Sequence, residues 1–133
     1  MDIKVKKLTV KSDERGWLTE IVRQEEVKRK KTFGQIYLTV AKPGITKGKH
    51  YHTRKTEYFC VIKGNGTLYL IDNNTHEKKN ILMGQKNFVM VEIPPYIWHA
   101  IKNTGREDLY LLGYIDEPMN PVDPDTFGME YRI

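Results

Sequence analysis

Short segments with the composition of β-strands recur along the whole chain and constrain its fold more than any other feature. Each is rich in β-branched and aromatic residues, and several alternate polar with apolar side chains. They cover residues 3–10, 16–22, 34–42, 67–72, 87–93 and 109–115. Turn-forming sequences such as KPG, KGNG, DNNT and NTGRED separate strands at intervals of roughly eight to twelve residues. This spacing predicts an all-β sandwich or closed barrel.

The length of the chain fits one domain. With 133 residues it can bury roughly two-thirds of its unfolded surface around a single core. We expect the barrel to cover residues 34–116, with N-terminal strands in residues 1–33. Residues 117–133 contain three prolines and are expected to form an irregular extension lying on the barrel. A helical turn or two is expected only in residues 19–31. A small barrel of this kind has a mouth where a small ligand fits.

The charge and hydropathy of the chain limit its partners. A net charge of +5 favours anionic ligands such as phosphates as readily as nucleic acid. The densest basic run, residues 28–31, has no interleaved aromatic residues, so we interpret it as a solvated connection and expect no nucleic-acid partner. No apolar run approaches the about 18 residues that a membrane span needs, and the N-terminus lacks the apolar core of a secretory signal. These features predict a cytoplasmic protein with no membrane partner.

Two of the four histidines are separated by a single residue, in the stretch KGKHYHTRKTE. On an extended strand, His50 and His52 point to the same side with Cα atoms about 6.5 Å apart, so both imidazoles can reach one ion. Glu57 follows a polar connection that can return the chain to a neighbouring strand, and His99 is the natural fourth ligand if its strand lies alongside. A single histidine on a strand is more typical of a surface residue. The four residues together predict a metal site.

This stretch resembles a known motif at every fixed position. Gly44, His50, His52, Glu57 and Gly64 have the spacing of the first cupin box. The resemblance implies a double-stranded β-helix, the cupin jelly-roll barrel, as a single domain over residues 1–133.

The second cupin box is matched in part. Pro94, His99 and Asn103 have its spacing, while Tyr96 stands where the family usually has glycine. In cupins the two histidines and the glutamate of the first box and the histidine of the second are metal ligands. The resemblance therefore implies a divalent metal, and such a donor set suits zinc, nickel, manganese or iron. The ligands that it assigns are His50, His52, Glu57 and His99. In a metal-free barrel the same residues can act as acid–base groups.

The segment DERGWLTE, residues 13–20, resembles the N-terminal segment of the dTDP-4-dehydrorhamnose 3,5-epimerase group, with Leu18 in place of a phenylalanine. In that group the segment reaches the neighbouring subunit of a dimer and helps to bind the nucleotide. The resemblance implies a homodimer, with residues 1–33 as a dimer arm and Arg15 and Glu20 as substrate-binding residues. An arginine fork fits a diphosphate, although an exposed salt bridge is the alternative. Trp17 can stack on a base or sugar, or simply pack.

The likeness over the whole chain is greatest to the C-terminal cupin domain of bifunctional capsular-polysaccharide enzymes that process UDP-linked 4-keto sugars. It rests on DERGWLTE, KPGITKGKHYH, VIKGNG, EIPPYIWHAIKNTG and NPVDPDTF. The implied function is that of a nucleotide-sugar epimerase or ketoisomerase, acting beside the keto group of a dTDP- or UDP-linked 4-keto-6-deoxy sugar in bacterial cell-surface polysaccharide biosynthesis. Two alternatives remain open, a metal-dependent cupin oxygenase and a non-catalytic cupin that binds sugar nucleotides.

Proton transfer beside a ketone needs a base and an acid. An imidazole suits the base, and His50 matches the catalytic histidine of the epimerase group. That role competes with metal ligation, because a nitrogen bound to a metal cannot also take a proton. Related epimerases use a tyrosine near the end of the barrel as the acid. Tyr110 and Tyr114 share one face of a strand, and Tyr114 is preferred because it is nearer the strand end. Tyr37 and Tyr51 remain further candidates.

Overall fold

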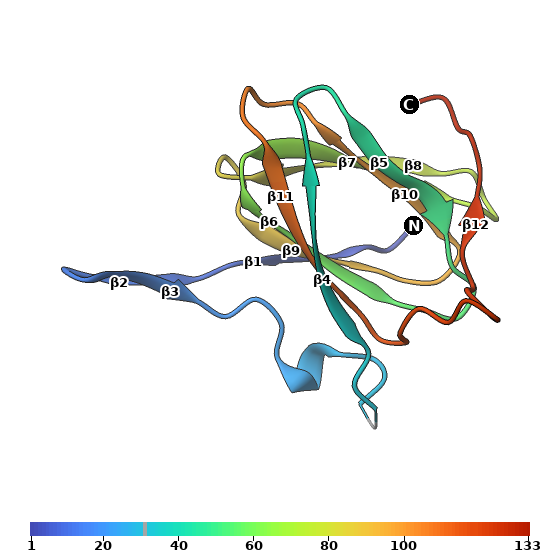
Figure 1. Cartoon of the computed structure of the whole chain (residues 1–133), viewed down its shortest axis with the longest axis horizontal. Coiled ribbons are helices and arrows are strands. Elements are labelled where there is room, and N and C mark those ends of the chain that lie inside the picture. Colours follow the sequence, from blue (N-terminus) through green and yellow to red (C-terminus); the bar gives the residue numbers. More distant parts are fainter. Residues whose placement is uncertain (31) are drawn as a thin grey trace.

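The computed structural model describes residues 1–30 and 32–133, and its regular structure consists almost entirely of strands (Figure 1). Two five-stranded antiparallel sheets enclose the core. The first sheet contains, in spatial order, β1 (Lys4–Lys7), β9 (Val89–Ile93), β6 (Glu57–Lys63), β11 (Leu109–Ile115) and β4 (Gln35–Ala41). The second contains β12 (Phe127–Gly128), β5 (Thr46–Tyr51), β10 (Ile97–Asn103), β7 (Asn65–Asp72) and β8 (Lys78–Gly84). The predicted all-β jelly-roll fold is confirmed.

The core lies between the inner faces of the two sheets. Leu68 and Leu70 of β7 are fully buried, and they belong to the same cluster as Val91 of β9 and Leu109 of β11. Residues two apart on a strand share a face, so the alternating apolar residues of β7 all reach this core. Burial of each such side chain contributes about 1.5–3 kcal/mol.

The barrel begins earlier in the chain than residue 34. Strand β1 pairs antiparallel with β9, with Val5 opposite Val91, and so belongs to the first sheet. Without β1, strand β9 would present an unpaired edge, which natural sheets avoid. The expected helical turns reduce to one 3-10 turn at Gln24–Glu26. Lys31, the last residue of the basic run, lies outside the described residues.

The hairpin of β2 (Val10–Asp13) and β3 (Gly16–Thr19) extends away from the barrel (Figure 1). Its apolar side chains find little cover within the chain, since 62% of Trp17 and 58% of Leu18 is exposed. The rings of Trp17 and Phe88 form a T-shaped pair with 6.1 Å between their centroids. An arm of this kind is suited to contact a second molecule.

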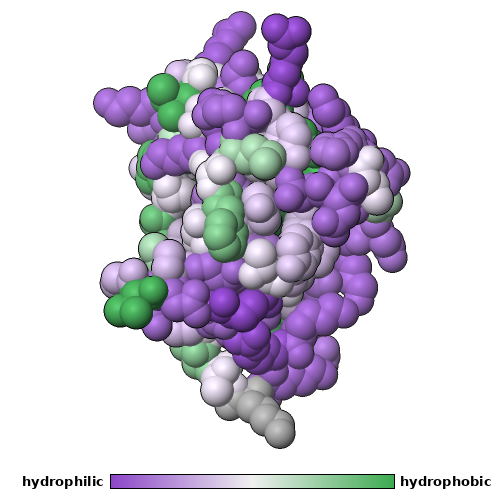
Figure 2. Space-filling model, turned by 90° about the vertical axis from the view of Figure 1, so that its right-hand side faces the viewer, coloured by the Kyte–Doolittle hydropathy of each residue, from purple (hydrophilic) through white to green (hydrophobic). Residues whose placement is uncertain are grey.

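The C-terminal segment is more ordered than expected. It runs along one side of the barrel, and Phe127 pairs with Tyr51 so that β12 adds a short strand beside β5 (Figure 1). On the face that Figure 2 shows, hydrophilic side chains predominate and apolar ones are scattered, as is typical of a water-exposed surface. In the described part of the chain, no helix is long and apolar enough to cross a membrane.

Candidate metal and proton-transfer site

The structure brings the four predicted ligands together inside the barrel. His50 lies near the end of β5, His52 follows that strand, and His99 lies opposite His50 on the paired strand β10. Glu57 is the first residue of β6 and comes from the other sheet. One ligand atom from each of the four residues lies within 4.8 Å of those of the other three. The site therefore joins the two sheets.

A bulge in β5 sets the direction of the first histidine. Gly48 and Lys49 have φ values of +98° and +61°, and the pairing of β5 with β10 shifts between His99 and Ala100. A Cβ atom at Gly48 would lie 3.0 Å from the backbone oxygen of His99. Only glycine accepts both this φ and this close approach without strain. Gly48 lies in the stretch KGKHYHTRKTE, but a regular strand was expected there and the bulge was not.

His52 is held at both ring nitrogens. Its Nδ1 lies 2.7 Å from the backbone oxygen of Asp125, so Nδ1 carries a hydrogen and donates it. Its Nε2 lies 2.5 Å from Oε1 of Glu57. Burial opposes protonation of His52, but the hydrogen bond to Glu57 outweighs it and raises the pKa of the ring above its ordinary value. With Nδ1 fixed as the donor, Nε2 is the atom that could bind a metal.

His99 has the same arrangement. Its Nδ1 donates to the backbone oxygen of Ile97 at 3.0 Å, so Nε2 presents its lone pair to the cluster. This Nε2 is buried, lies 3.2 Å from Oε1 of Glu57, and makes no hydrogen bond of acceptable geometry with the described residues. A buried ring nitrogen without a partner needs an explanation, and a metal ion provides one. The donor atoms present therefore fit a divalent transition metal.

Glu57 is anchored on the side away from the histidines. Only 2% of it is exposed, and the hydroxyl of Tyr37 donates to Oε2 at 2.5 Å. Burial raises the pKa of the Glu57 carboxyl, but the His52 hydrogen bond and the neighbouring imidazoles outweigh it and hold the pKa well below its ordinary value. A Cβ atom at Gly113 would lie 2.4 Å from Cζ of Tyr37, so the tyrosine ring can reach Glu57 only across a glycine.

His50 differs from the other two histidines. It is half-buried, and the backbone of Gly48 makes only a small contribution to the pKa of the ring. Burial, reinforced by the nearby His99, lowers the pKa of His50 to about 4. The ring is therefore neutral at pH 7 and has a nitrogen available to accept a proton.

A cavity of about 440 Å³ opens onto this cluster between the two sheets. Its polar lining outside the cluster includes Tyr37, Lys47 and Lys55, and its apolar lining includes Phe59 and Leu111. Within the cavity, the carboxylate of Glu57 is already engaged by a tyrosine and a histidine. The remaining charge of the lining is positive, and the cavity therefore favours an anionic ligand.

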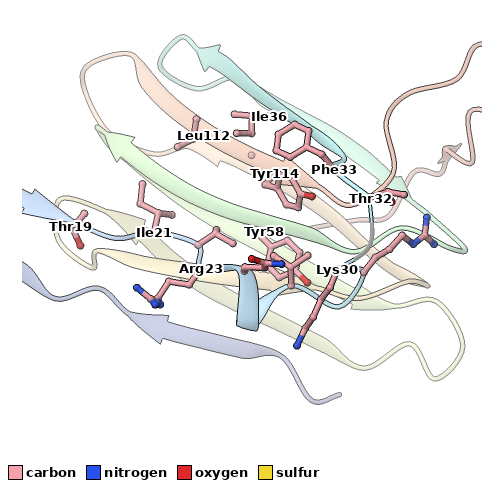
Figure 3. Close-up of a pocket in the computed structure, with 15 residues that line it drawn as sticks. Thr19, Ile21, Arg23, Lys30, Thr32, Phe33, Ile36, Tyr58, Leu112 and Tyr114 are labelled. Atoms are coloured by element: carbon pink, nitrogen blue, oxygen red, sulfur yellow. The ribbon is translucent and has the colours of Figure 1, made fainter.

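Tyr114, the preferred acid, is not part of this site. Side chains alternate along β11, so Leu111 and Ile115 face the cavity while Tyr114 faces the outside of the sheet. There its hydroxyl accepts a hydrogen bond from the backbone N–H of Gly34 at 3.0 Å, and its ring packs against Phe33 in a separate pocket (Figure 3). The expectation that Tyr114 acts together with His50 is therefore corrected. The tyrosine that reaches the cluster is Tyr37.

The predicted substrate-binding residues of the arm also lie outside the cavity. Arg15 pairs with Asp13 at 2.6 Å within the hairpin, and Glu20 pairs with Arg23 at 2.7 Å. Both ion pairs are exposed. Neither these residues nor Trp17 lines the cavity of its own chain.

Asp125 and Lys55 are among the residues of the site that were not predicted. Asp125 holds His52 through its backbone oxygen, and Lys55 lines the cavity with 2% of its surface exposed. The segment NPVDPDTF was part of the family likeness, so it offered a signal for Asp125. Lys55 lies in the polar connection between His52 and Glu57, where the sequence offers no signal that a lysine is buried.

Comparison with known proteins fits this architecture. Residues 11–127 match the family model described as the polysaccharide biosynthesis C-terminal domain. The chain belongs to this family. It is 30% identical over 128 residues to the spore coat polysaccharide biosynthesis protein SpsL of Bacillus subtilis, covering 92% of this chain and 84% of SpsL.

Another relative is much longer than this chain. The chain is 32% identical over 117 residues to UDP-2-acetamido-2,6-beta-L-arabino-hexul-4-ose reductase of Pseudomonas aeruginosa, covering 88% of this chain but 30% of the reductase. The chain thus spans about a third of that relative. A dTDP sugar isomerase from Desulfovibrio desulfuricans has the same fold, with a TM-score of 0.85 and 20% identity over 96% of this chain and 83% of the isomerase. This likeness agrees with the predicted jelly-roll fold.

Proposed function

We propose that this protein is an epimerase or ketoisomerase that moves a proton beside the keto group of a dTDP- or UDP-linked 4-keto-6-deoxy sugar, in bacterial cell-surface polysaccharide biosynthesis. One observation carries the proposal. A neutral, half-buried histidine lines the cavity beside three buried groups, each of which is held by a hydrogen bond from outside the cluster. Proton transfer requires such a base at a defined distance from a rigid centre. Since sugar nucleotides are made in the cytoplasm, we infer that the protein works there.

We assign the roles within the cluster from their anchoring. His52 and His99 each donate Nδ1–H to a backbone oxygen and Glu57 is bound by Tyr37, which is the support that metal ligands usually have. We propose that these three residues hold a divalent metal: zinc, nickel, manganese or iron. When bound, the metal would polarise the substrate carbonyl. His50 has no comparable support, so we place it as the base, although it remains close enough to be a fourth ligand.

The proposed reaction needs no redox partner. His50 takes the proton from the carbon beside the ketone, the C–H electron pair forms a carbon–carbon double bond, and the carbonyl oxygen becomes negative. Return of a proton to the same carbon from the opposite face gives the epimer. Return to the former carbonyl carbon, with transfer of the hydroxyl proton, gives the keto isomer. The pKa of about 4 keeps His50 in the accepting form at neutral pH.

The charge of the cavity supports an anionic substrate. Lys47 lies at an exposed position of β5, and its ammonium donates to Thr39 at 2.9 Å. A diphosphate entering the cavity can bind there, because a lysine is a flexible positive charge. The name of the Pseudomonas relative describes a UDP-linked sugar with a 4-keto group, which agrees with this class of substrate.

We further propose a homodimer in which the hairpin of β2 and β3 from each chain reaches the partner, while β1 of the expected arm stays in its own barrel. The outer face of β4 and β11 exposes apolar side chains, with Ile36 59% and Leu38 54% exposed. Beside them lies a pocket of about 600 Å³, whose lining includes Ile21, Phe33, Tyr58 and Tyr114 (Figure 3). Exposed apolar surface of this kind favours an interface. In such a dimer, Arg15, Trp17 and Glu20 would complete the nucleotide site of the other chain.

Hydrogen exchange tests the reaction class. The protein, loaded with Zn²⁺ in one sample and Mn²⁺ in another, is incubated in D₂O with dTDP- and UDP-linked 4-keto-6-deoxy sugars and followed by proton NMR. We expect one carbon beside the ketone to lose its proton signal, with a rate that depends on the amount of protein. If no sugar of the panel exchanges faster than in buffer, the proposed function is wrong.

A further inference from the structure

Lys55 is a buried positive charge without a carboxylate partner. Only 2% of the residue is exposed, and it lies between two of the proposed metal ligands in sequence. Its ammonium donates to the backbone oxygen of Pro124 at 2.9 Å, and no carboxylate of the described residues lies within 4.0 Å of it. A buried charge is costly unless it is paired. A neutral carbonyl compensates for only part of that cost.

The C-terminal segment fixes this ammonium beside the histidines. The backbone oxygens of two consecutive residues, Pro124 and Asp125, accept hydrogen bonds from Lys55 and His52. The hydroxyl of Thr126 also donates to the oxygen of Pro124, at 3.1 Å. Lys55 and His52 line the same cavity. An ammonium has three hydrogens to donate, and the described residues accept one of them.

We propose that Lys55 is a further catalytic residue, whose ammonium hydrogen-bonds the sugar oxygen that becomes negative when the neighbouring carbon loses its proton. This role rests on the proposed function. The exposed Lys47 can meet the diphosphate at the mouth of the cavity, whereas the buried Lys55 can be reached only by the part of the substrate that enters. As the C–H electron pair forms the double bond, the carbonyl electron pair moves to the oxygen. The interaction of a fixed positive charge with that oxygen is stronger in the transition state than in the ground state, and it therefore accelerates proton removal.

The substitution Lys55→Met removes the charge and keeps the length of the side chain. Two probes are titrated into the wild type and the variant: Zn²⁺ alone into the metal-free protein, and tropolone, whose anion carries negative ring oxygens, into the Zn²⁺-loaded protein. Loss of a nearby positive charge should strengthen Zn²⁺ binding by about threefold or more. Loss of a hydrogen bond from a charged donor should weaken tropolone binding by about tenfold or more.

The opposite signs separate this role from a structural one. If Lys55 only held the C-terminal segment against His52, the variant would bind both probes more weakly, because His52 would lose its support. Lys79→Met, which removes the same charge from an exposed position of β8, should leave both affinities unchanged. Any result other than stronger Zn²⁺ binding together with weaker tropolone binding overturns the proposal.

The exchange reaction gives a further readout. For a sugar that the wild type exchanges, Lys55→Met should lower kcat by about 100-fold with a much smaller change in KM, as expected for an interaction made mainly in the transition state. An unchanged kcat would contradict the role of Lys55. If the wild type exchanges no sugar, the proposed function fails, while the two titrations still decide whether Lys55 holds an anionic oxygen beside the metal site.

Discussion

At the scale of single residues, the three buried members of the cluster owe their orientation to groups outside it. Backbone oxygens of Ile97 and Asp125 fix the two ring tautomers, and Tyr37 fixes the carboxylate. Loss of such a supporting contact typically lowers metal affinity by about 10- to 100-fold. Asp125 has a second role, because its carboxylate accepts the backbone N–H groups of Thr53 and Arg54, at 3.0 and 2.9 Å. It thus holds the connection between His52 and Glu57.

The substitution Asp125→Asn tests that role. Burial raises the pKa of the Asp125 carboxyl, but the hydrogen bonds from Thr53 and Arg54 outweigh burial and lower the pKa below its ordinary value. A group with a lowered folded-state pKa stabilises the protein fully above its ordinary pKa of about 4, and that contribution is lost as the pH falls toward the folded value. We therefore expect the variant to lose about 1–3 kcal/mol of unfolding free energy at pH 7. The difference from the wild type should shrink below about pH 4.

Urea denaturation from pH 3 to pH 7 measures this difference. The matched control is Asp123→Asn, two residues earlier in the same segment, where 63% of the side chain is exposed. It should change the unfolding free energy by less than about 0.5 kcal/mol. A difference between wild type and Asp125→Asn that stays constant over the whole range would contradict the assignment.

The sequence predicts the cluster better than it predicts the surroundings of the cluster. His50, His52, Glu57 and His99 follow from spacing, because a motif with fixed intervals places its members on neighbouring strands. The phase of β11 does not follow, since LYLLGYI is apolar on both faces. The outer face is apolar because Ile21, Val22 and Val27 cover part of it, which the local pattern cannot reveal. For this reason the sequence alone does not separate Tyr114 from Tyr37.

At the scale of elements, the strands with strong alternation were predicted and those held by the rest of the fold were not. Strand β8 begins with Lys78, Lys79 and Asn80, which carry no strand signal, and it forms through backbone pairing with β7. Strand β12 pairs over two residues, Phe127 and Gly128, in a proline-rich segment. Backbone pairing of this kind depends on a neighbouring edge and leaves little trace in the local sequence.

The outer face of β4 is predicted to form the dimer interface. In the proposed dimer Ile36 is buried between subunits, so Ile36→Glu should convert a dimer into a monomer with an unchanged circular dichroism spectrum. Leu82→Glu, on the other sheet, replaces a side chain that is 43% exposed and should leave the dimer intact. Sedimentation equilibrium of the three proteins measures the result. A wild type that is monomeric at micromolar concentration, or an Ile36→Glu variant that stays dimeric, would contradict this interface.

At the scale of the whole molecule, the two sheets each supply part of one centre. The second sheet contributes the histidines, the first contributes Glu57 and Tyr37, and the C-terminal segment holds His52 and Lys55 from outside both sheets. The cavity therefore exists only in the closed barrel. This dependence explains why the fold could be predicted from strand spacing and family likeness, while the lining of the cavity required the structure.

In the proposed mechanism, His50 moves the proton and the other three residues of the cluster hold the metal. Zinc content by elemental analysis and deuterium exchange of a reactive 4-keto sugar are measured together on the wild type, His50→Asn and His99→Ala. We predict that His50→Asn keeps its zinc and loses exchange by about 100-fold or more, whereas His99→Ala loses zinc. A His50→Asn variant that exchanges at the wild-type rate, or that loses its zinc, would contradict the assignment of His50 as the base.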